Sequence, residues 1–180
     1  MKTDFLEKVS EAIKQIEQKE LKRALELFKF RRMIPKAKIF VIGNGGSAAL
    51  ASHFANDLNR FTDYTAYSLC DSVPAITSIG NDDDFEAIFS RQIDKYFRPG
   101  NDKLLVAISS SGNSPNILHA AGLAKGLGAE VVALTGFDGG ELKKLADASI
   151  HIPTEKGEYE LVESVHGAVL HYLSLCLKKI

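Results

Sequence analysis

The stretch FVIGNGGSAALASHFANDLNR, residues 40–60, joins an apolar run to a glycine-rich turn and then to a helical pattern. A short apolar run without polar alternation predicts a strand that is covered on both faces, as in a parallel sheet. The turn at residues 43–47 would place backbone N–H groups at the start of the helix, where anions bind. The stretch therefore predicts a strand–turn–helix unit of an α/β fold with a candidate anion site.

The same alternation continues along the chain. After the first strand at 38–43, strands are expected at 65–70, 103–109, 130–136 and 148–153, and helices at 4–30, 47–61, 72–79, 83–97, 114–127, 141–146 and 159–179. Alternating strands and helices predict a parallel sheet flanked by helices on both faces. We expect one α/β domain over residues 1–180, with five parallel strands in a flavodoxin- or Rossmann-like arrangement. Residues 1–34 form an N-terminal helical arm, and 36–180 form the core.

The bulk composition favours a soluble globular protein. Its 22 basic and 23 acidic residues give a net charge of −1, which offers no general attraction to nucleic acid or to an anionic membrane. No apolar run is long enough to span a membrane, and charges at Lys2 and Asp4 argue against a signal peptide. Cys70 and Cys176 lie in apolar runs, so we expect buried free thiols and a cytoplasmic location.

Both ends of the chain carry helical patterns with apolar faces. Near the N-terminus a narrow stripe consists of Leu6, Val9, Ile13 and Ile16. It predicts either a helix that covers one face of the domain or an arm that packs on another subunit. The helix expected at 159–179 is apolar on most of its faces, so it must be buried in the domain or at an interface.

A second turn, SSSGNS at residues 109–114, resembles the first in position and chemistry. Neither turn contains lysine or arginine, and the GK[ST] signature of nucleotide triphosphate loops is missing. Residues 43–48 match G-x-G-x-x-A, with Asp71 as a candidate ribose ligand, but the serine turn has no role in dinucleotide binding. One such turn alone would be an ordinary connection. Two of them favour the phosphate monoester of a small molecule.

Polar side chains recur on two of the expected helices. His53 and Asp57 are four residues apart and share a helix face, and Glu163 and His171, eight apart, lie roughly on one side of the C-terminal helix. Two histidines and two carboxylates can bind Zn²⁺ or carry out acid–base chemistry. A site shared by all four is therefore a hypothesis. His119 and His166 are interpreted as ordinary surface or core residues.

Five motifs together carry a family resemblance. GNGGS, HFAND, SIGNDDDFEAIFSRQ, ISSSGNS and ALTGFDGG resemble the SIS (sugar isomerase) domain family, and within it the phosphoheptose isomerases, over nearly the whole chain. The resemblance implies a cytoplasmic homotetramer of α/β subunits with active sites between subunits. It implies the interconversion of sedoheptulose 7-phosphate and a heptose 7-phosphate, on the route to ADP-heptose.

The resemblance also assigns roles to individual positions. Asp57 becomes the base and His171 the acid of an isomerisation through an enediol. One Zn²⁺ per subunit, where metal is present, falls on His53, Asp57, Glu163 and His171. Substrate contacts fall on Asn44, Gly45, Gly46, Ser47, Asp57, Asn81, Asp82 and Glu163, and phosphate contacts on Ser109, Ser110, Ser111 and Ser114.

Two positions depart from the family pattern, which has Glu at position 57 and Gln at position 163. Asp57 is shorter than Glu by one methylene, roughly 1.5 Å, and Glu163 adds a negative charge. An isomerase of another sugar phosphate is therefore one alternative. A second is a non-catalytic binding protein, because some family members bind a replication initiator protein. Those members tend to lose the catalytic carboxylate and histidine, whereas Asp57 and His171 are titratable here, which favours catalysis.

Overall fold

The computed structural model describes residues 4–34, 37–97 and 102–178. Its five strands, all parallel, form one sheet in the order β2-β1-β3-β4-β5. They are β1 (Lys38–Gly43), β2 (Thr65–Ser68), β3 (Lys103–Ser109), β4 (Glu130–Thr135) and β5 (Ala148–His151). The predicted α/β fold with a five-stranded parallel sheet is confirmed.

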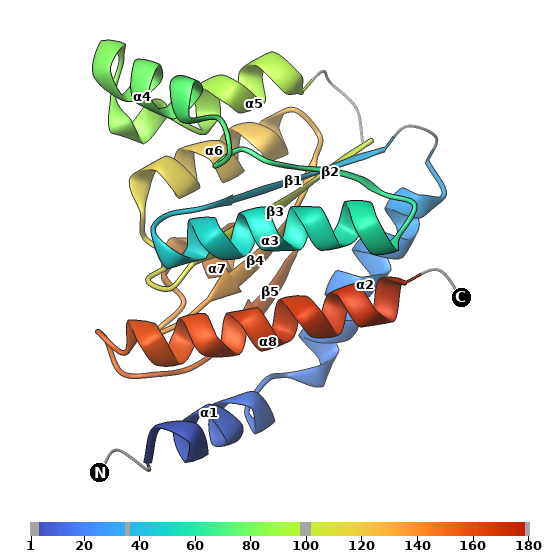
Figure 1. Ribbon diagram of the computed structural model, residues 1–180, viewed down its shortest axis with the longest axis vertical. Coiled ribbons are helices and arrows are strands. Elements are labelled where there is room, and N and C mark those ends of the chain that lie inside the picture. Colours follow the sequence, from blue (N-terminus) through green and yellow to red (C-terminus); the bar gives the residue numbers. More distant parts are fainter. Residues whose placement is uncertain (1–3, 35–36, 98–101, 179–180) are drawn as a thin grey trace.

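Helices cover both faces of the sheet and give the molecule three layers (Figure 1). One face carries α1 (Asp4–Lys14), α2 (Gln18–Arg32), α3 (Gly46–Phe61) and α8 (Tyr159–Leu177). The other carries α4 (Val73–Asp82), the 3₁₀ turn η1 (Phe85–Ala87), α5 (Ser90–Tyr96), α6 (Pro115–Gly126) and α7 (Gly140–Leu145). In β1, Ile39 and Val41 face the first layer and Phe40 and Ile42 the second, so these four consecutive residues are all apolar.

The strand order defines a switch point between β1 and β3. The chain passes from β1 outward to β2 on one side, and from β3 outward to β4 and β5 on the other. In sheets of this topology the crevice at the carboxyl ends of the two central strands is the usual ligand site. The two glycine- and serine-rich turns follow β1 and β3, so they flank this crevice.

The N-terminal arm differs from the expected single helix at 4–30. It consists of α1 and α2, with a break after Lys14 that leaves Glu17 extended at the start of α2. The break allows α1 to pack on α8 while α2 packs on β5, which one straight helix could not do. Tertiary burial therefore overrides local helix propensity here. Of the predicted stripe Ile16 is buried, whereas Leu6 is 75% exposed. The expected boundary at 35–36 lies outside the described residues.

The helix expected at 83–97 is also wrong. Helix α4 already extends to Asp82, and the chain then turns through η1 before α5 begins. The side chain of Asp84 accepts a hydrogen bond from the Glu86 backbone N–H (3.0 Å), which caps η1. Asp83 forms an ion pair with Arg91 (2.7 Å) across the turn.

Both cysteines are free thiols, as predicted. Cys70 is half-buried, but Cys176 is exposed on the outer side of α8, so the expectation of a buried Cys176 is wrong. In the described part of the chain, no helix combines the length and apolar character needed to cross a bilayer.

Candidate active site

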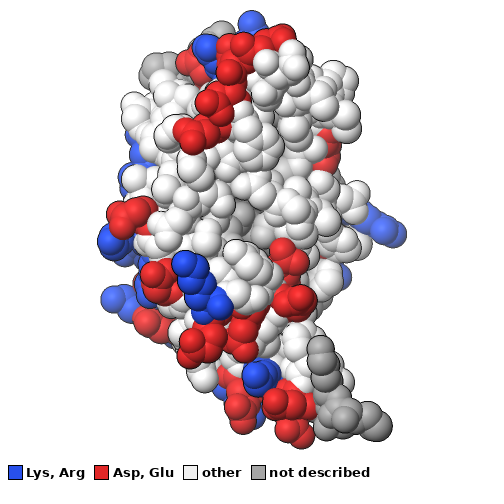
Figure 2. All heavy atoms as spheres, turned by 90° about the vertical axis from the view of Figure 1, so that its left-hand side faces the viewer, with Lys and Arg blue, Asp and Glu red and all other residues white. Residues whose placement is uncertain are grey.

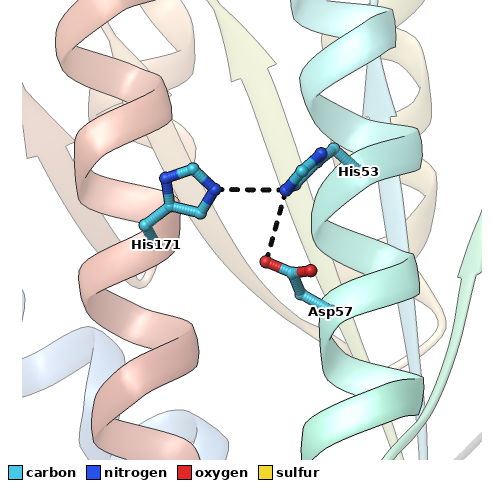
Figure 3. A group of neighbouring side chains, drawn as sticks. All are labelled: His53, Asp57 and His171. Carbon is cyan, nitrogen blue, oxygen red and sulfur yellow. Dashed lines mark hydrogen bonds and ion pairs between the residues drawn. The ribbon is translucent and has the colours of Figure 1, made fainter.

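A histidine–aspartate–histidine cluster lies between α3 and α8 (Figure 3). His53 and Asp57 come from successive turns of α3, and their Nε2 and Oδ2 atoms are 3.4 Å apart. His171 points toward them from α8, with its Nε2 atom 3.1 Å from Nε2 of His53. His53 and Asp57 share one face of α3, and the packing of α3 on α8 adds His171 to form a three-residue site.

The members of this cluster differ in exposure. Asp57 is buried to 8% exposure, whereas 56% of the His53 side chain is accessible. At 3.1 Å the two imidazoles form a hydrogen bond only when one Nε2 carries a proton and the other accepts it. A carboxylate beside an accessible pair of imidazoles can transfer protons to and from a bound molecule.

The same three atoms are also suitably placed for a metal ion. The candidate ligand atoms of His53, Asp57 and His171 all lie within 4.8 Å of one another. Ligands of tetrahedral Zn²⁺ at 2.0–2.1 Å are about 3.3 Å apart, close to the observed 3.1 and 3.4 Å. Two imidazoles and one carboxylate are a donor set that zinc accepts.

Glu163 lies apart from these three side chains. Its carboxylate packs against the Cα of Gly46, and any side chain at position 46 would collide with it. This places Glu163 at the first turn of α3, where the helix dipole favours a negative charge. Burial, and to a smaller extent Glu160, raises the pKa of Glu163 above its usual range.

The turn after β1 requires glycine for its conformation. Gly45 has a φ of 54°, a region that side chains with a Cβ rarely adopt, and it precedes the first helical residue, Gly46. Asn44 is half-buried, and its side-chain amide exchanges two hydrogen bonds of 2.9 Å with the amide of Asn116. Ser47 is buried within the first turn of α3.

The turn after β3 is held in place by its own side chains and by a neighbouring loop. The Gly112 N–H donates to Oγ of Ser109 (3.2 Å), whose hydroxyl lies 3.4 Å from that of Ser114. From the loop after β4, Gly136 N–H donates to the Ser110 carbonyl (2.9 Å). Ser111 and Ser114 are half-buried and offer neutral donors at the crevice.

Figure 2 looks onto the side of the molecule where α3 and α8 begin. Uncharged side chains fill the middle of this face, and charged side chains surround it. Neither turn itself contains lysine or arginine, but Lys156 lines a cavity of about 250 Å³ together with Ser111 and Asn113. At the turns an anion would be held by N–H and O–H dipoles, and Lys156 adds a cationic side chain beside the serine turn.

Asn81 and Asp82 are exposed at the end of α4, where Asn81 Nδ2 donates to Asp82 Oδ1 (2.8 Å). Within the described residues, no hydrogen bond joins them to either turn or to the cluster.

Asp71 accepts a hydrogen bond from Ser52. Ser52 and Asp71 both line a cavity of about 630 Å³ along β2, and none of the cluster's side chains lines this cavity.

The two histidines that the sequence left aside have different surroundings. His119 is a surface residue 3.9 Å from Glu86. His166 is fully buried beside the backbone of Thr135, and neither ring nitrogen makes a hydrogen bond of normal geometry within the described residues. Burial lowers the pKa of His166 to about 4, so its ring is neutral at physiological pH.

Sequence reasoning missed Asn116. It is 2% exposed, lies in the first turn of α6 and joins the serine turn to the glycine turn through Asn44. The available signal was weak, because an asparagine near a helix start is ordinary capping chemistry. Its partner is 72 residues away in the sequence.

Comparisons with known proteins agree with this geometry. A SIS domain family model matches residues 4–136, and a second SIS domain model matches residues 98–177. The phosphoheptose isomerase of Aromatoleum aromaticum is 40% identical over 147 residues, covering 78% of this chain and 73% of that one.

Solved structures give the same result. A phosphoheptose isomerase from Neisseria gonorrhoeae superposes with a TM-score of 0.85 at 32% identity, covering 97% of this chain and 92% of that one. One from Francisella tularensis gives 0.87 at 26% identity, with coverages of 97% and 93%. The chain belongs to the SIS domain family and, within it, to the phosphoheptose isomerase family.

Proposed function

We propose that the protein is an aldose–ketose isomerase that converts sedoheptulose 7-phosphate to D-glycero-D-manno-heptose 7-phosphate through an enediol. One observation carries the proposal: a His–Asp–His cluster stands on α3 and α8, and the start of α3 follows the glycine turn at the carboxyl end of β1. His53 follows Gly46 by seven residues, about 10 Å along α3. That separation suits a sugar phosphate held by its phosphate at one end and reacting at the other.

The phosphate is a handle and not a leaving group in this reaction. Neutral donors therefore suffice, and we assign the phosphate to Ser109, Ser110, Ser111 and Ser114. We assign the sugar to Asn44, Gly45, Gly46, Ser47, Asn81, Asp82 and Glu163. Binding energy from the phosphate end then positions C1 and C2 at the cluster.

The chemistry needs one base at carbon and one group that exchanges protons with oxygen. The carboxylate of Asp57 takes a proton from C1 of the ketose, and the C2 carbonyl oxygen takes a proton from His171, which gives the enediol. Asp57 then returns its proton to C2, and His171 removes the proton from the C1 hydroxyl, leaving the aldehyde. The burial of Asp57 and the exposure of His171 support these roles.

We further propose one Zn²⁺ per subunit on His53, Asp57 and His171, with Glu163 as the fourth ligand after a change of side-chain rotamer. When bound, the ion would supply a Lewis acid for the sugar oxygens, whereas the proton transfers assigned to Asp57 and His171 need their ligand atoms free of the ion. The spacing of the three ligand atoms supports the site. Metal analysis of protein purified without chelator, beside His53→Ala, tests it. Equal metal content in the two would reject the site.

Asp57 and Glu163 are the reason for considering a second substrate. At position 57 the side chain is shorter by about 1.5 Å, and at position 163 a negative charge is added. These differences suit either the same heptulose phosphate in an altered pose or another sugar phosphate. Asp57→Glu separates these. With the heptulose phosphate as substrate, the longer side chain keeps or raises activity. With a pocket built around aspartate for another sugar, it lowers activity on that sugar.

We also propose a cytoplasmic homotetramer with active sites that need more than one chain, in a route to ADP-heptose. Two free thiols support a reducing compartment. Helix α4 has no buried residue although it is largely apolar, and Leu6 and Leu175 are 75% and 62% exposed. Such surface is typical of an interface. A monomer by light scattering at micromolar concentration would contradict this assembly.

The experiment that tests the function is a coupled isomerase assay against a panel of pentose, hexose and heptose phosphates, with and without Zn²⁺. We expect the heptulose phosphate to be converted fastest. Binding of sugar phosphates without turnover of any would favour the non-catalytic binding protein.

A further inference from the structure

One pair of side chains among the described residues joins the turn after β1 to the helix that follows the serine turn. Asn44 Nδ2 donates to Asn116 Oδ1 and Asn116 Nδ2 donates to Asn44 Oδ1, both at 2.9 Å. Asn44 belongs to the turn after β1 and Asn116 to the helix after the serine turn of β3. The pair therefore crosses the switch point, where β1 and β3 are neighbours and diverge.

A third hydrogen bond fixes which way both amides point. The backbone N–H of Ile117 donates to Oδ1 of Asn116 (3.0 Å), so the oxygen of this amide must face Ile117. An amide turned over would place its NH₂ group against that N–H. Because the Asn116 oxygen is an acceptor, the Asn44 atom that faces it must be the donor Nδ2, so the orientation of the Asn44 amide is fixed as well.

The donor and acceptor sides of the Asn44 amide are therefore defined. One of its two N–H bonds and one lone pair of its oxygen are used by Asn116, and its second N–H has no acceptor among the described residues. Asn44 is half-buried, whereas Asn116 is 2% exposed, so Asn44 is the more accessible of the two residues. The accessible amide thus presents an oriented donor next to the neutral donors of both turns.

We propose that Asn116 is a positioning residue that acts through Asn44, holding the Asn44 amide so that its free N–H donates to an oxygen of the bound sugar phosphate. This inference deepens the proposed function and rests on it. Asn116 itself touches no substrate. Without it, Asn44 can rotate or flip, and the donor must be ordered again each time a ligand binds.

The prediction is a loss of affinity with little loss of turnover, because the donor contacts the sugar phosphate equally in the ground and transition states. We expect Asn116→Ala to raise KM about three- to tenfold, as expected for one hydrogen bond, and to change kcat less than twofold. Asn116→Ser, which keeps a hydroxyl near Ile117 but cannot reach Asn44, should give the same result and covers the case in which the alanine variant folds poorly.

A double-mutant cycle provides the decisive readout. If Asn116 acts only through Asn44, then Asn44→Ala, Asn116→Ala and the double variant share one KM. The matched control is Asn59→Ala. Its amide also makes two hydrogen bonds, of 2.7 and 2.9 Å, to the backbone of Ala66 at the outer edge of β2. It should lose stability and keep the wild-type KM.

Additive effects of Asn44→Ala and Asn116→Ala, or a lowered Tm with an unchanged KM, would overturn the inference. The Kd for sedoheptulose 7-phosphate, measured by calorimetry, separates this failure from failure of the proposed function. If the wild type binds the sugar phosphate without converting it, the proposed isomerase activity is rejected. The ratio of the Kd of Asn116→Ala to that of Asn59→Ala then decides the role of Asn116. A wild type that binds no sugar phosphate overturns both.

Discussion

The two ends of the sheet use polar residues in opposite ways. At the amino ends of the strands, charged side chains pair with one another: Arg31 with Glu130 at 2.5 Å, and Lys103 with Asp102. Nε of Arg31 also donates to the Lys103 carbonyl (3.1 Å), which ties α2 to the sheet. At the carboxyl ends stand serine, asparagine and glycine, with the His53–Asp57–His171 cluster between α3 and α8.

Polar residues at the amino end of the sheet thus serve stability, and those at the carboxyl end serve function. Arg31 is 1% exposed, and a buried charge of this kind needs its partner to repay the cost of desolvation. The donors of the two turns are neutral, so they can remain accessible in the absence of ligand at little cost. Substitutions at the amino end should therefore change the free energy of unfolding, and those at the carboxyl end should change catalysis.

The largest expected effect comes from Asp57→Asn. The amide cannot accept the carbon proton, so kcat should fall by at least 10²- to 10⁴-fold, the usual contribution of a general base. Because both turns are unchanged, the Kd for the sugar phosphate should stay close to that of the wild type. Calorimetry and the coupled assay measure the two quantities. Full activity of Asp57→Asn on every sugar tested would exclude Asp57 as the base.

Next in size is the loss of the Arg31 side chain at the amino end. Arg31→Ala should lower the free energy of unfolding by about 3–5 kcal/mol, since it removes a large side chain of 1% exposure together with its hydrogen bonds to Glu130 and to the Lys103 carbonyl. KM should not change. Urea unfolding checks the stability. Arg91→Ala, which removes an exposed ion pair, is the control and should cost less than about 1 kcal/mol. Equal losses would break the contrast between the ends.

His166 provides a pH test of the core between the two ends. Its pKa is lowered from 6.5 to about 4 by burial, so below pH 6.5 the unfolded chain binds a proton that the folded chain does not. Stability from this residue is complete above pH 6.5 and is lost as the pH falls toward 4, by about 3 kcal/mol in all. Urea unfolding of wild type and His166→Leu between pH 7 and 4.5 should differ in slope. Parallel curves would show that His166 is not neutral in the folded protein.

The smallest effect is expected at the serine turn. Ser111→Ala removes one neutral donor to the phosphate, so KM should rise about tenfold while kcat changes little. The control is Ser174→Ala, near the end of α8, which should leave KM unchanged; the buried Ser174 hydroxyl has no hydrogen-bond partner in the part of the chain that the structure describes. A collapsed kcat with an unchanged KM at Ser111 would contradict its assignment to the phosphate.

Sequence alone predicted the fold class, because apolar strands alternating with helices admit few arrangements. It did not predict the break between α1 and α2, since no glycine or proline marks it and only contacts with α8 and β5 require it. Helical spacing paired His53 with Asp57, because spacing on one helix is a local property. It also paired Glu163 with His171, whereas the packing of α8 on α3 brings His171 to His53. The places of Glu163 against Gly46 and of Asn116 against Asn44 depend on packing between distant segments.

The central claim is that the cluster moves a proton between C1 and C2 of a sugar phosphate held by neutral donors. Its most direct test is NMR of sedoheptulose 7-phosphate incubated with the wild type in D₂O. The account predicts formation of the aldose phosphate with deuterium at C2, back-exchange into C1 of the ketose, and neither with Asp57→Asn. Unchanged ketose without deuterium in the presence of wild type, with or without added Zn²⁺, would contradict it.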